Sequence, residues 1–187
     1  MVTSPSRNLT LAEFLQLPET KPASEYIDGQ IIQKPIPQGQ HSTLQGELVS
    51  LINSIFKPQK IARAFPELRC TFGGRSIVPD VTVFKWERIP LNEKGRVANI
   101  FPIYPDWTIE ILSPDQNITR VNKNIVHCLK HGSSLGWLIN SEEESVLVYP
   151  PHQTIEVLDN QNQILPVPEF LSDLQLTVGE LFSLLDG

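Results

Sequence analysis

The sequence predicts an α+β domain, in which a mixed β-sheet is flanked by α-helices and preceded by a short helix and a hairpin. The chain has 187 residues, of which 40% are hydrophobic and 19% are charged, and these values suit a globular fold with a sizeable core. Two long segments have apolar residues at helical spacing, and several short apolar runs lie around them. Helices and strands in this order are typical of the α+β class. We therefore expect residues 1–187 to form one domain.

The N-terminal part of the sequence predicts a short helix, a hairpin and a long helix. Residues 10–13 read TLAE, the pattern of a capping box, and predict a short helix there. Asp28 and Gly29 stand between two runs that contain apolar residues, which is a strong signal of a tight hairpin turn. Between residues 42 and 56 the apolar residues recur every three or four positions, as in an amphipathic helix, and Pro58 ends that helix.

The rest of the chain predicts strands with one helix between them and another at the end. Strands are expected at residues 61–65, 68–72, 81–84, 107–112, 135–140, 145–149 and 154–158. The pair Gly73-Gly74 predicts a turn, because no Lys-Ser or Lys-Thr follows it as in a phosphate-binding loop. A helix is expected over residues 119–131, closed by Gly132, and a last helix follows a second capping box that begins at Thr177.

The charge distribution allows two interpretations. The net charge of -6 argues against a nucleic-acid partner, because affinity for nucleic acid comes from Lys and Arg that meet phosphates. Residues 57–131, however, hold twelve Lys or Arg against seven Asp or Glu, a balance of +5, whereas residues 132–187 hold none against nine, a balance of -9. This asymmetry fits a basic working surface with an acidic flank, and equally a self-associating protein whose two patches meet.

The cysteine content and the start of the chain predict a cytoplasmic protein. Cys70 and Cys128 are too few and too far apart in sequence for a disulfide framework, so two reduced thiols are expected. The first ten residues are polar, and no apolar run approaches the length of a membrane span. We therefore expect no membrane partner.

Two carboxylates associated with apolar strands are the strongest functional signal. Asp80 immediately precedes the run at residues 81–84, and Glu110 interrupts the run at residues 107–112. Strand side chains alternate between faces, so the two acids meet if their strands are neighbours. Two negative charges about 4 Å apart repel by about 4 kcal/mol at an effective dielectric of about 20, and a divalent cation would reverse that repulsion. The pair therefore predicts a Mg²⁺ (or Mn²⁺) site, and the implied reaction is hydrolysis of a phosphodiester.

The expected helix at residues 119–131 has a basic face. With about 100° of turn per residue, the face opposite the sheet carries Arg120, Lys123, His127, Lys130 and His131. Arg120, Lys123 and Lys130 are therefore candidate nucleic-acid contacts, although a solvated face that complements the helix C-terminus would have the same pattern. His127 and His131 have the spacing of helical zinc ligands, but no third ligand is evident in the sequence.

Several of these residues also stand in the order of a known family. The motifs are Glu25-Tyr26-Ile27-Asp28-Gly29, His41, Pro79-Asp80-Val81, Glu110-Ile111-Leu112-Ser113-Pro114, Gly132 and Trp137-Leu138-Ile139. In this order the chain resembles the Uma-type family of bacterial proteins described as putative restriction endonucleases, within the PD-(D/E)XK nuclease superfamily. The resemblance implies a restriction-endonuclease-like core and a metal-dependent endonuclease that acts on DNA, with Asp80 and Glu110 as metal ligands and the Ile111 carbonyl as a further ligand. A homodimer is expected, because cutting both strands of a duplex needs two sites.

The chain departs from the pattern of the superfamily at the lysine. The usual position, two residues after the glutamate, is Leu112 here, and similar family members carry their lysine on the following helix, at the position of Asn124. Lys123 is one residue earlier and is our candidate for the catalytic lysine, together with Asp80 and Glu110.

Two alternatives to an active nuclease remain open. The first is a nuclease-fold protein that has lost its chemistry and acts as a binding or assembly module, which the absence of a lysine at positions 112 and 124 would explain. The second is a purely structural role, in which the two acids pair with basic residues, for which Arg69 and Arg75 are conceivable partners.

Overall fold

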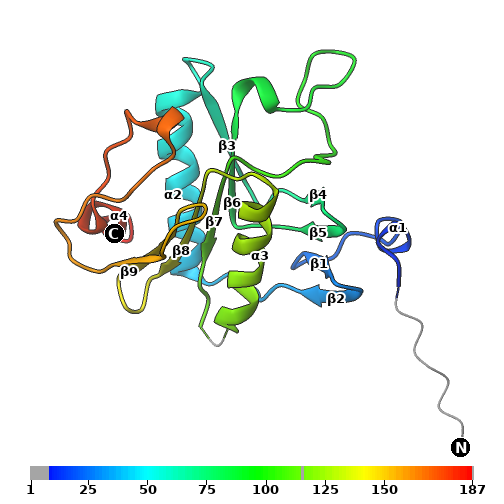
Figure 1. The fold of residues 1–187 in the computed structure, drawn as a ribbon, viewed down its shortest axis with the longest axis horizontal. Helices are drawn as coiled ribbons and strands as arrows, with labels where there is room; N and C mark the ends of the chain where they lie inside the picture. Colours follow the sequence, from blue (N-terminus) through cyan, green and yellow to red (C-terminus); the bar gives the residue numbers. More distant parts are fainter. Residues whose placement is uncertain (1–8, 115, 187) are drawn as a thin grey trace, which may run out of the picture.

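The computed structural model describes residues 9–114 and 116–186, and in this part of the chain the strands form two sheets (Figure 1). The helices are α1 (Leu11–Phe14), α2 (Gly39–Phe56), α3 (Ile118–His131) and α4 (Val178–Ser183), with 3-10 turns at Trp86–Arg88 and Glu169–Leu171. The strands are β1 (Ser24–Ile27), β2 (Gln30–Gln33), β3 (Ala62–Pro66), β4 (Cys70–Phe72), β5 (Arg75–Ile77), β6 (Val81–Lys85), β7 (Trp107–Ile111), β8 (Leu135–Asn140), β9 (Ser145–Tyr149) and β10 (Glu156–Leu158).

The larger sheet is mixed, as the sequence predicted. Its strand order is β10-β9-β8-β7-β6-β3, and β7 and β8 run parallel while the other neighbours are antiparallel. Helix α3 connects the two parallel strands, as a crossover between parallel neighbours requires. β6 and β7 are direct neighbours in this sheet, which is the condition on which the predicted meeting of the two acids depended.

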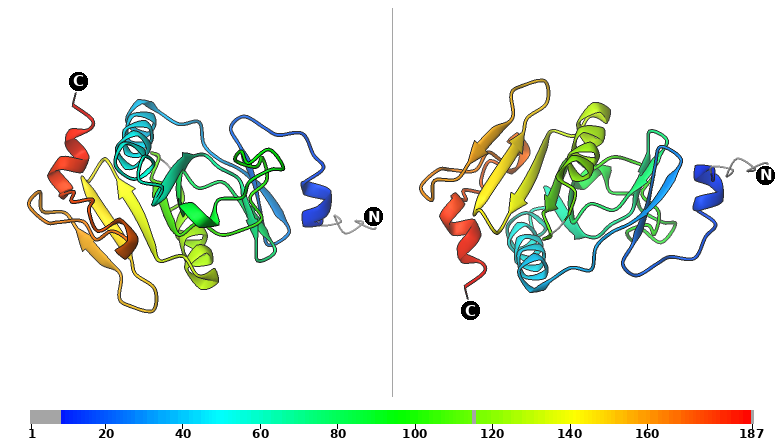
Figure 2. Two further views of the ribbon diagram at one scale, coloured as in Figure 1. Left: turned by 90° about the horizontal axis from the view of Figure 1, so that it is seen from above. Right: turned by 90° about the horizontal axis from the view of Figure 1, so that it is seen from below.

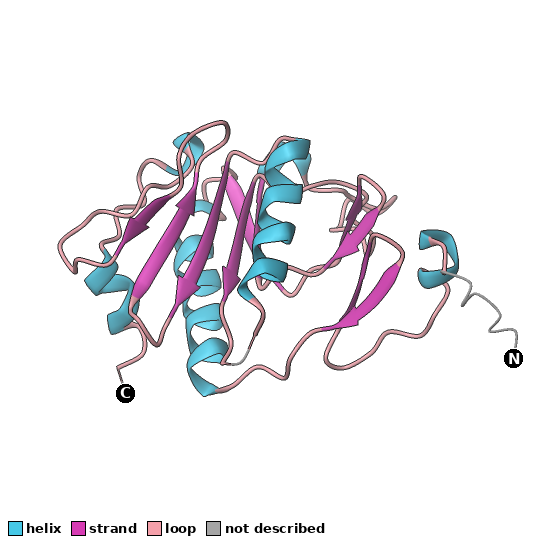
Figure 3. Ribbon diagram, turned by 60° about the horizontal axis from the view of Figure 1, so that its bottom comes forward, coloured by secondary structure: helices cyan, strands magenta, loops and turns pink. Residues whose placement is uncertain are grey.

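Helices cover both faces of the larger sheet, with α2 on one face and α3 on the other (Figure 3). Because strand side chains alternate, Trp107, Ile109 and Ile111 of β7 point into the main core, which α2 and α4 complete. The intervening residues of β7, Thr108 and Glu110, therefore belong to the α3 face. Glu110 thus lies between the larger sheet and α3, the helix that carries the predicted basic residues.

A second, smaller sheet has the order β2-β1-β5-β4 and is antiparallel throughout. It lies beside α1 at the end of the molecule away from α4 (Figure 2). The mixed sheet and the hairpin expected from the sequence are both present, but the sequence did not predict that β4 and β5 would join the hairpin in a second sheet. Strand β5 has only three residues after the Gly73-Gly74 turn, and so short a run gives little periodicity by which to recognise it.

The local signals at helix ends and turns are confirmed. Thr10 and Thr177 each form a complete capping box with the glutamate three residues later. Asp28 and Gly29 both have positive φ, 51° and 84°, as the tight turn of a hairpin requires, and Gly132 ends α3 in the left-handed region. Within the described residues, none of the helices has both the length and the apolar character needed to cross a membrane.

Candidate active site

Asp80 and Glu110 meet on the α3 side of the larger sheet. In the β6–β7 ladder Val81 lies opposite Ile109, which places Asp80 beside Glu110 at the end of β6. The backbone N–H of Asp80 points at Oε2 of Glu110, 3.4 Å away, and the two residues are only 2% and 3% exposed. The two carboxylates that the sequence singled out therefore form one buried site.

The carboxylate of Asp80 is fixed by donors on every side. Its Oδ2 accepts a hydrogen bond from the Ile111 N–H at 2.7 Å, and its Oδ1 lies 2.6 Å from the Lys34 ammonium and 3.3 Å from His41 Nε2. Gln45 of α2 holds the Asp80 carbonyl at 2.7 Å. Burial alone would raise the pKa of Asp80, but Lys34 and His41 outweigh it and hold the pKa well below its usual value. Asp80 is therefore ionised throughout the physiological range.

Glu110 is in the opposite electrostatic situation. Its Oε2 lies 3.9 Å from the Lys34 ammonium, whereas Oε1 is buried without a hydrogen-bond partner among the described residues. Burial and the neighbouring charges of Asp80 and Glu25 raise its pKa well above the ordinary 4.5, against the attraction of Lys34. An orphaned carboxylate oxygen in a buried site is the kind of atom for which a ligand accounts.

The site contains a lysine that the sequence analysis missed. Lys34 follows β2, and its backbone N–H bonds to Ala23, which extends the β1–β2 ladder by one residue. Its ammonium donates to Asp80 and to the Val78 carbonyl, both at 2.6 Å, and its side chain is 10% exposed. Burial alone would lower the pKa of Lys34, but Asp80, Glu110 and Glu25 together raise it above 10.5. Lys34 is therefore a permanent cation of the site.

A third acid, Glu25 of β1, joins the site from the smaller sheet. Its Oε1 accepts hydrogen bonds from the Val78 N–H at 2.8 Å and from Asn124 Nδ2 at 3.1 Å. Glu25 is 3% exposed, and together with Asp80 and Glu110 it forms what we call the acidic cluster. The cluster holds three buried carboxylates against the single ammonium of Lys34. Glu25 interrupts a buried strand just as Glu110 does, so the same signal could have identified it.

His41, which belongs to the motif order of the resemblance, lies in the site as well. It is buried in the first turn of α2, and its Nδ1 lies 3.1 Å from the Ser113 hydroxyl while its Nε2 faces Asp80. The contact with Ser113 fixes the orientation of the ring. The sequence gives no signal for this position, since a polar residue at the start of an expected helix is more often merely exposed.

Of the three predicted nucleic-acid contacts, Lys123 and Lys130 lie exposed on the outer face of α3 and Arg120 is half-buried. Lys123 and Lys130 are exposed and, with Arg75, border a shallow depression along the helix. Arg120 and Lys123 border a second depression, against the β1–β2 hairpin. Asn124, not Lys123, is the α3 residue that reaches the acidic cluster. A catalytic role for Lys123 stays a prediction, and no described contact joins its ammonium to Asp80 or Glu110.

The two histidines of α3 each use one ring nitrogen to contact a backbone carbonyl. His127 was expected on the polar face, but it is buried, stacks on the Phe72 ring at 4.7 Å and contacts the Phe72 carbonyl through Nε2 at 3.1 Å. His131 uses Nδ1 to contact the His127 carbonyl. The His127 ring packs on Phe72 of the smaller sheet. A helical projection considers α3 alone and therefore does not include this contact. In the described residues no group of three or more His, Cys, Asp or Glu is arranged to hold a metal.

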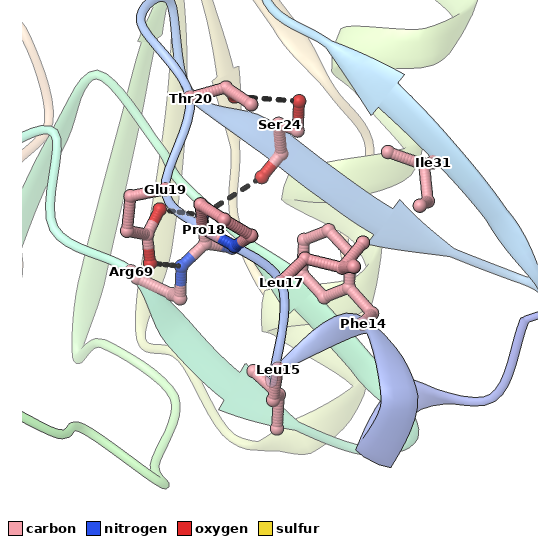
Figure 4. A pocket seen from close by; sticks show the side chains of 9 residues that line it. All are labelled: Phe14, Leu15, Leu17, Pro18, Glu19, Thr20, Ser24, Ile31 and Arg69. Atoms are coloured by element: carbon pink, nitrogen blue, oxygen red, sulfur yellow. Dashed lines mark hydrogen bonds and ion pairs between the residues drawn. The ribbon is translucent and has the colours of Figure 1, made fainter.

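The basic residues proposed as structural partners of the two acids are engaged elsewhere. Figure 4 shows Arg69 beside α1, where its guanidinium bonds to Glu19 and to the Ser24 carbonyl. Arg75 pairs with Asp28 at 2.7 Å, which ties β5 to the hairpin turn. The interpretation that Arg69 or Arg75 neutralises Asp80 or Glu110 is therefore wrong, and Lys34 is the cation that does so.

Comparisons with known proteins relate the chain to proteins that are described as putative nucleases. The family model Uma2, described as a putative restriction endonuclease, matches residues 11–179. A crystal structure of a putative nuclease of the DUF820 family from Anabaena variabilis has 63% sequence identity and a TM-score of 0.93, and the match covers 95% of this chain and 99% of that one. No protein with a curated description matches the chain. The α+β nuclease fold and the family expected from the sequence are thereby confirmed.

Proposed function

The chain belongs to the Uma2 family, and we propose that it is a metal-dependent endonuclease that hydrolyses DNA phosphodiester bonds at Asp80 and Glu110. The observation that carries this proposal is the buried meeting of these two carboxylates, in which the Oε1 of Glu110 has no hydrogen-bond partner among the residues that the structure describes. A stabilising ion pair would satisfy both acids, whereas here Lys34 pairs closely with Asp80 alone, and ionised Glu110 would add a buried negative charge without a close partner. A divalent cation would neutralise that charge.

The residues present fit Mg²⁺ or Mn²⁺. Both cations prefer carboxylate and carbonyl oxygens, and Mg²⁺ is commonly held by one or two carboxylates together with water and substrate phosphates. Asp80 and Glu110 supply the carboxylates, and the carbonyl of Ile111 stays the predicted third ligand. When bound, the cation would lower the pKa of a water molecule and offset the charge on the phosphate.

The protein's own residues would orient the reaction. In hydrolysis the water oxygen bonds to phosphorus, the bond from phosphorus to one ester oxygen breaks, and the water gives up a proton while the leaving oxygen gains one. The Ile111 N–H fixes one oxygen of Asp80, and Gln45 fixes the Asp80 backbone, so the carboxylate keeps its direction. Burial by the sheet and α3 excludes bulk water, which strengthens each electrostatic contact.

The outer face of α3 supports DNA as the partner. Arg120, Lys123 and Lys130 are near the depressions along this helix, and basic side chains there would meet phosphates without reading sequence. We also propose that the protein is a homodimer, because cutting both strands of a DNA duplex needs two sites. Removing one phosphate contact should reduce the slope of the logarithm of the DNA-binding constant against the logarithm of the salt concentration by about one.

A second candidate function is a binding module without catalysis. It is favoured by Asn124, an uncharged amide at the point where α3 reaches the acidic cluster, and by Leu112. In that case Lys34 would be a fixed counter-ion of Asp80, and DNA binding would survive Asp80→Asn without any cleavage at all.

The test is a calorimetric titration of Mn²⁺ into the metal-free wild type, Asp80→Asn and Glu110→Ala, followed by cleavage of plasmid and linear DNA with Mn²⁺ or Mg²⁺. Glu142→Gln, an exposed acid in the turn before β9, is the matched control. Loss of Mn²⁺ binding and of cleavage in both site variants but not in the control supports the proposal. A wild type that binds no Mn²⁺, even with DNA present, and cuts nothing would refute it.

A further inference from the structure

The ammonium of Lys34 has the position that an active-site cation would need. It touches Asp80 Oδ1 at 2.6 Å and stands 3.9 Å from Glu110 Oε2, so it faces both carboxylates at once. A third contact, to the Val78 carbonyl, fixes it from the side of the smaller sheet. Ion pairs of exposed lysines contribute little to stability. The Lys34 side chain is almost buried, so its charge loses hydration free energy, which these contacts must offset.

The hairpin β1–β2 delivers Lys34 to this place by its register. Ser24 pairs with Gln33 at the end of the ladder, and the next residue, Lys34, bonds back to Ala23. The same hairpin provides Glu25, whose carboxylate accepts from the N–H of Val78 while Lys34 binds the carbonyl of that residue. The lysine is thus held by backbone pairing and not by a flexible loop.

Helix α3 offers no equivalent cation. The α3 residue that contacts the acidic cluster is Asn124, whose amide donates to both oxygens of Glu25 at 3.1 and 3.2 Å but carries no charge. The Oδ1 of Asn124 is buried without a hydrogen-bond partner in the described part of the chain. Lys123, one residue earlier, is exposed on the outer face. Lys34 and Asn124 approach the Val78–Glu25 contact from two different elements.

We propose that Lys34 is the catalytic lysine of this site, supplied by the hairpin in place of α3, and that in the metal-free protein it competes with the metal for Asp80 and Glu110. This inference rests on the proposed nuclease function. During hydrolysis the ammonium would keep its protons and donate a hydrogen bond to a non-bridging phosphate oxygen, where negative charge develops. Without metal it pairs with Asp80 and lies 3.9 Å from Glu110, so a metal must displace it from Asp80.

Two readouts test the inference: Mn²⁺ affinity by calorimetry without DNA, and DNA cleavage with Mn²⁺. Lys34→Met removes the charge and keeps the length of the side chain. It should bind Mn²⁺ about tenfold more tightly or better, because the competing cation is gone, and should cleave about 100-fold more slowly or worse. Lys57→Met, an exposed lysine at the end of α2, is the matched control and should change neither readout.

A rescue experiment separates catalysis from folding. In the double variant Lys34→Met/Asn124→Lys a lysine again reaches the acidic cluster, now from α3, and cleavage should recover at least tenfold over Lys34→Met alone. Lys34→Arg keeps the positive charge beside Asp80, so it should fold and should bind Mn²⁺ within about threefold of wild type. Circular dichroism on each variant verifies that the fold is intact.

The outcomes distinguish this inference from the proposed function. Wild-type cleavage that survives unchanged in Lys34→Met overturns the inference alone, as does an Mn²⁺ affinity that falls or stays constant in that variant. Loss of cleavage in Lys123→Met with full activity in Lys34→Met would assign the role to α3 instead. A wild type that neither binds Mn²⁺ nor cuts DNA overturns the nuclease function, and with it the inference.

Discussion

Replacing Glu110 by glutamine should stabilise the metal-free protein at neutral pH. Glu110 faces two neighbouring acids, Asp80 and Glu25, and the ammonium of Lys34 is already bound to Asp80. Its pKa is therefore raised by burial and by those charges. Glutamine has nearly the same shape without the charge, so Glu110→Gln removes the energetic cost of a buried negative charge without opening a cavity.

The size and sign of the effect follow from proton linkage. The folded protein keeps the Glu110 proton to a higher pH than the unfolded chain, which loses it near 4.5, so the Glu110 contribution to stability falls as pH rises above that value. The loss is about 1.4 kcal/mol per pH unit and is limited by the distance from pH 4.5 to at most about 3 kcal/mol at pH 7. We expect Glu110→Gln to gain about 1–3 kcal/mol at pH 7 and almost nothing at pH 4.5.

The assay is thermal unfolding of wild type and Glu110→Gln with a chelator present, at several values between pH 4.5 and 7. A gain of this size would raise Tm by roughly 2–12 °C for a domain of this length. Other groups that titrate in this range, including His127, are common to both proteins and cancel in the difference. A variant that is less stable than wild type by the same amount at every pH would refute the reasoning, because Glu110 would then be an ionised partner of Lys34.

Three further predictions follow from the fold. Asp80→Asn should lower the free energy of unfolding by about 3–5 kcal/mol in urea, since it leaves the buried ammonium without its partner; a loss under 1 kcal/mol would contradict the ion pair. Gly136→Ala should cost about 1–3 kcal/mol, because the new Cβ would lie 2.4 Å from Ile125 Cγ2, and Ile125→Val should recover part of the loss in the same unfolding assay. Burial lowers the pKa of His127 to about 4, so the unfolded chain takes up a proton at this residue more readily than the folded protein, and stability falls as pH drops from 6.5 towards 4. His127→Gln should therefore flatten the decline of Tm over this pH range. An unchanged decline would show that the ring is not neutral when folded.

The larger sheet and its two acids were predictable because their signals are local. Asp80 and Glu110 each stand next to apolar residues whose alternation fixes a face, and adjacent strands then bring them together. Capping boxes and the Asp28-Gly29 turn depend on only a few consecutive residues, and each was confirmed. Such features need no knowledge of how the domain is packed.

The rest of the site depends on packing between the two sheets. Lys34 reads in the sequence as an ordinary polar residue after a strand, and only the register of the hairpin and its contact with Val78 turn it inward. The helical projection likewise placed Lys123 and His127 on one outer face, whereas Phe72 of the smaller sheet takes His127 into the interior. Sequence periodicity gives the face of one element but not which neighbour it meets.

The hairpin has a consequence for the order in which the chain folds. The contact between Glu25 and Asn124 joins residues 99 positions apart, and closing a loop of that length costs on the order of 4 kcal/mol of chain entropy. Until the hairpin docks, a partly formed larger sheet carries Asp80 and Glu110 without the Lys34 ammonium, and their repulsion opposes compaction. Docking of the hairpin should therefore be a late step of refolding, one that divalent ions or screening salt would accelerate.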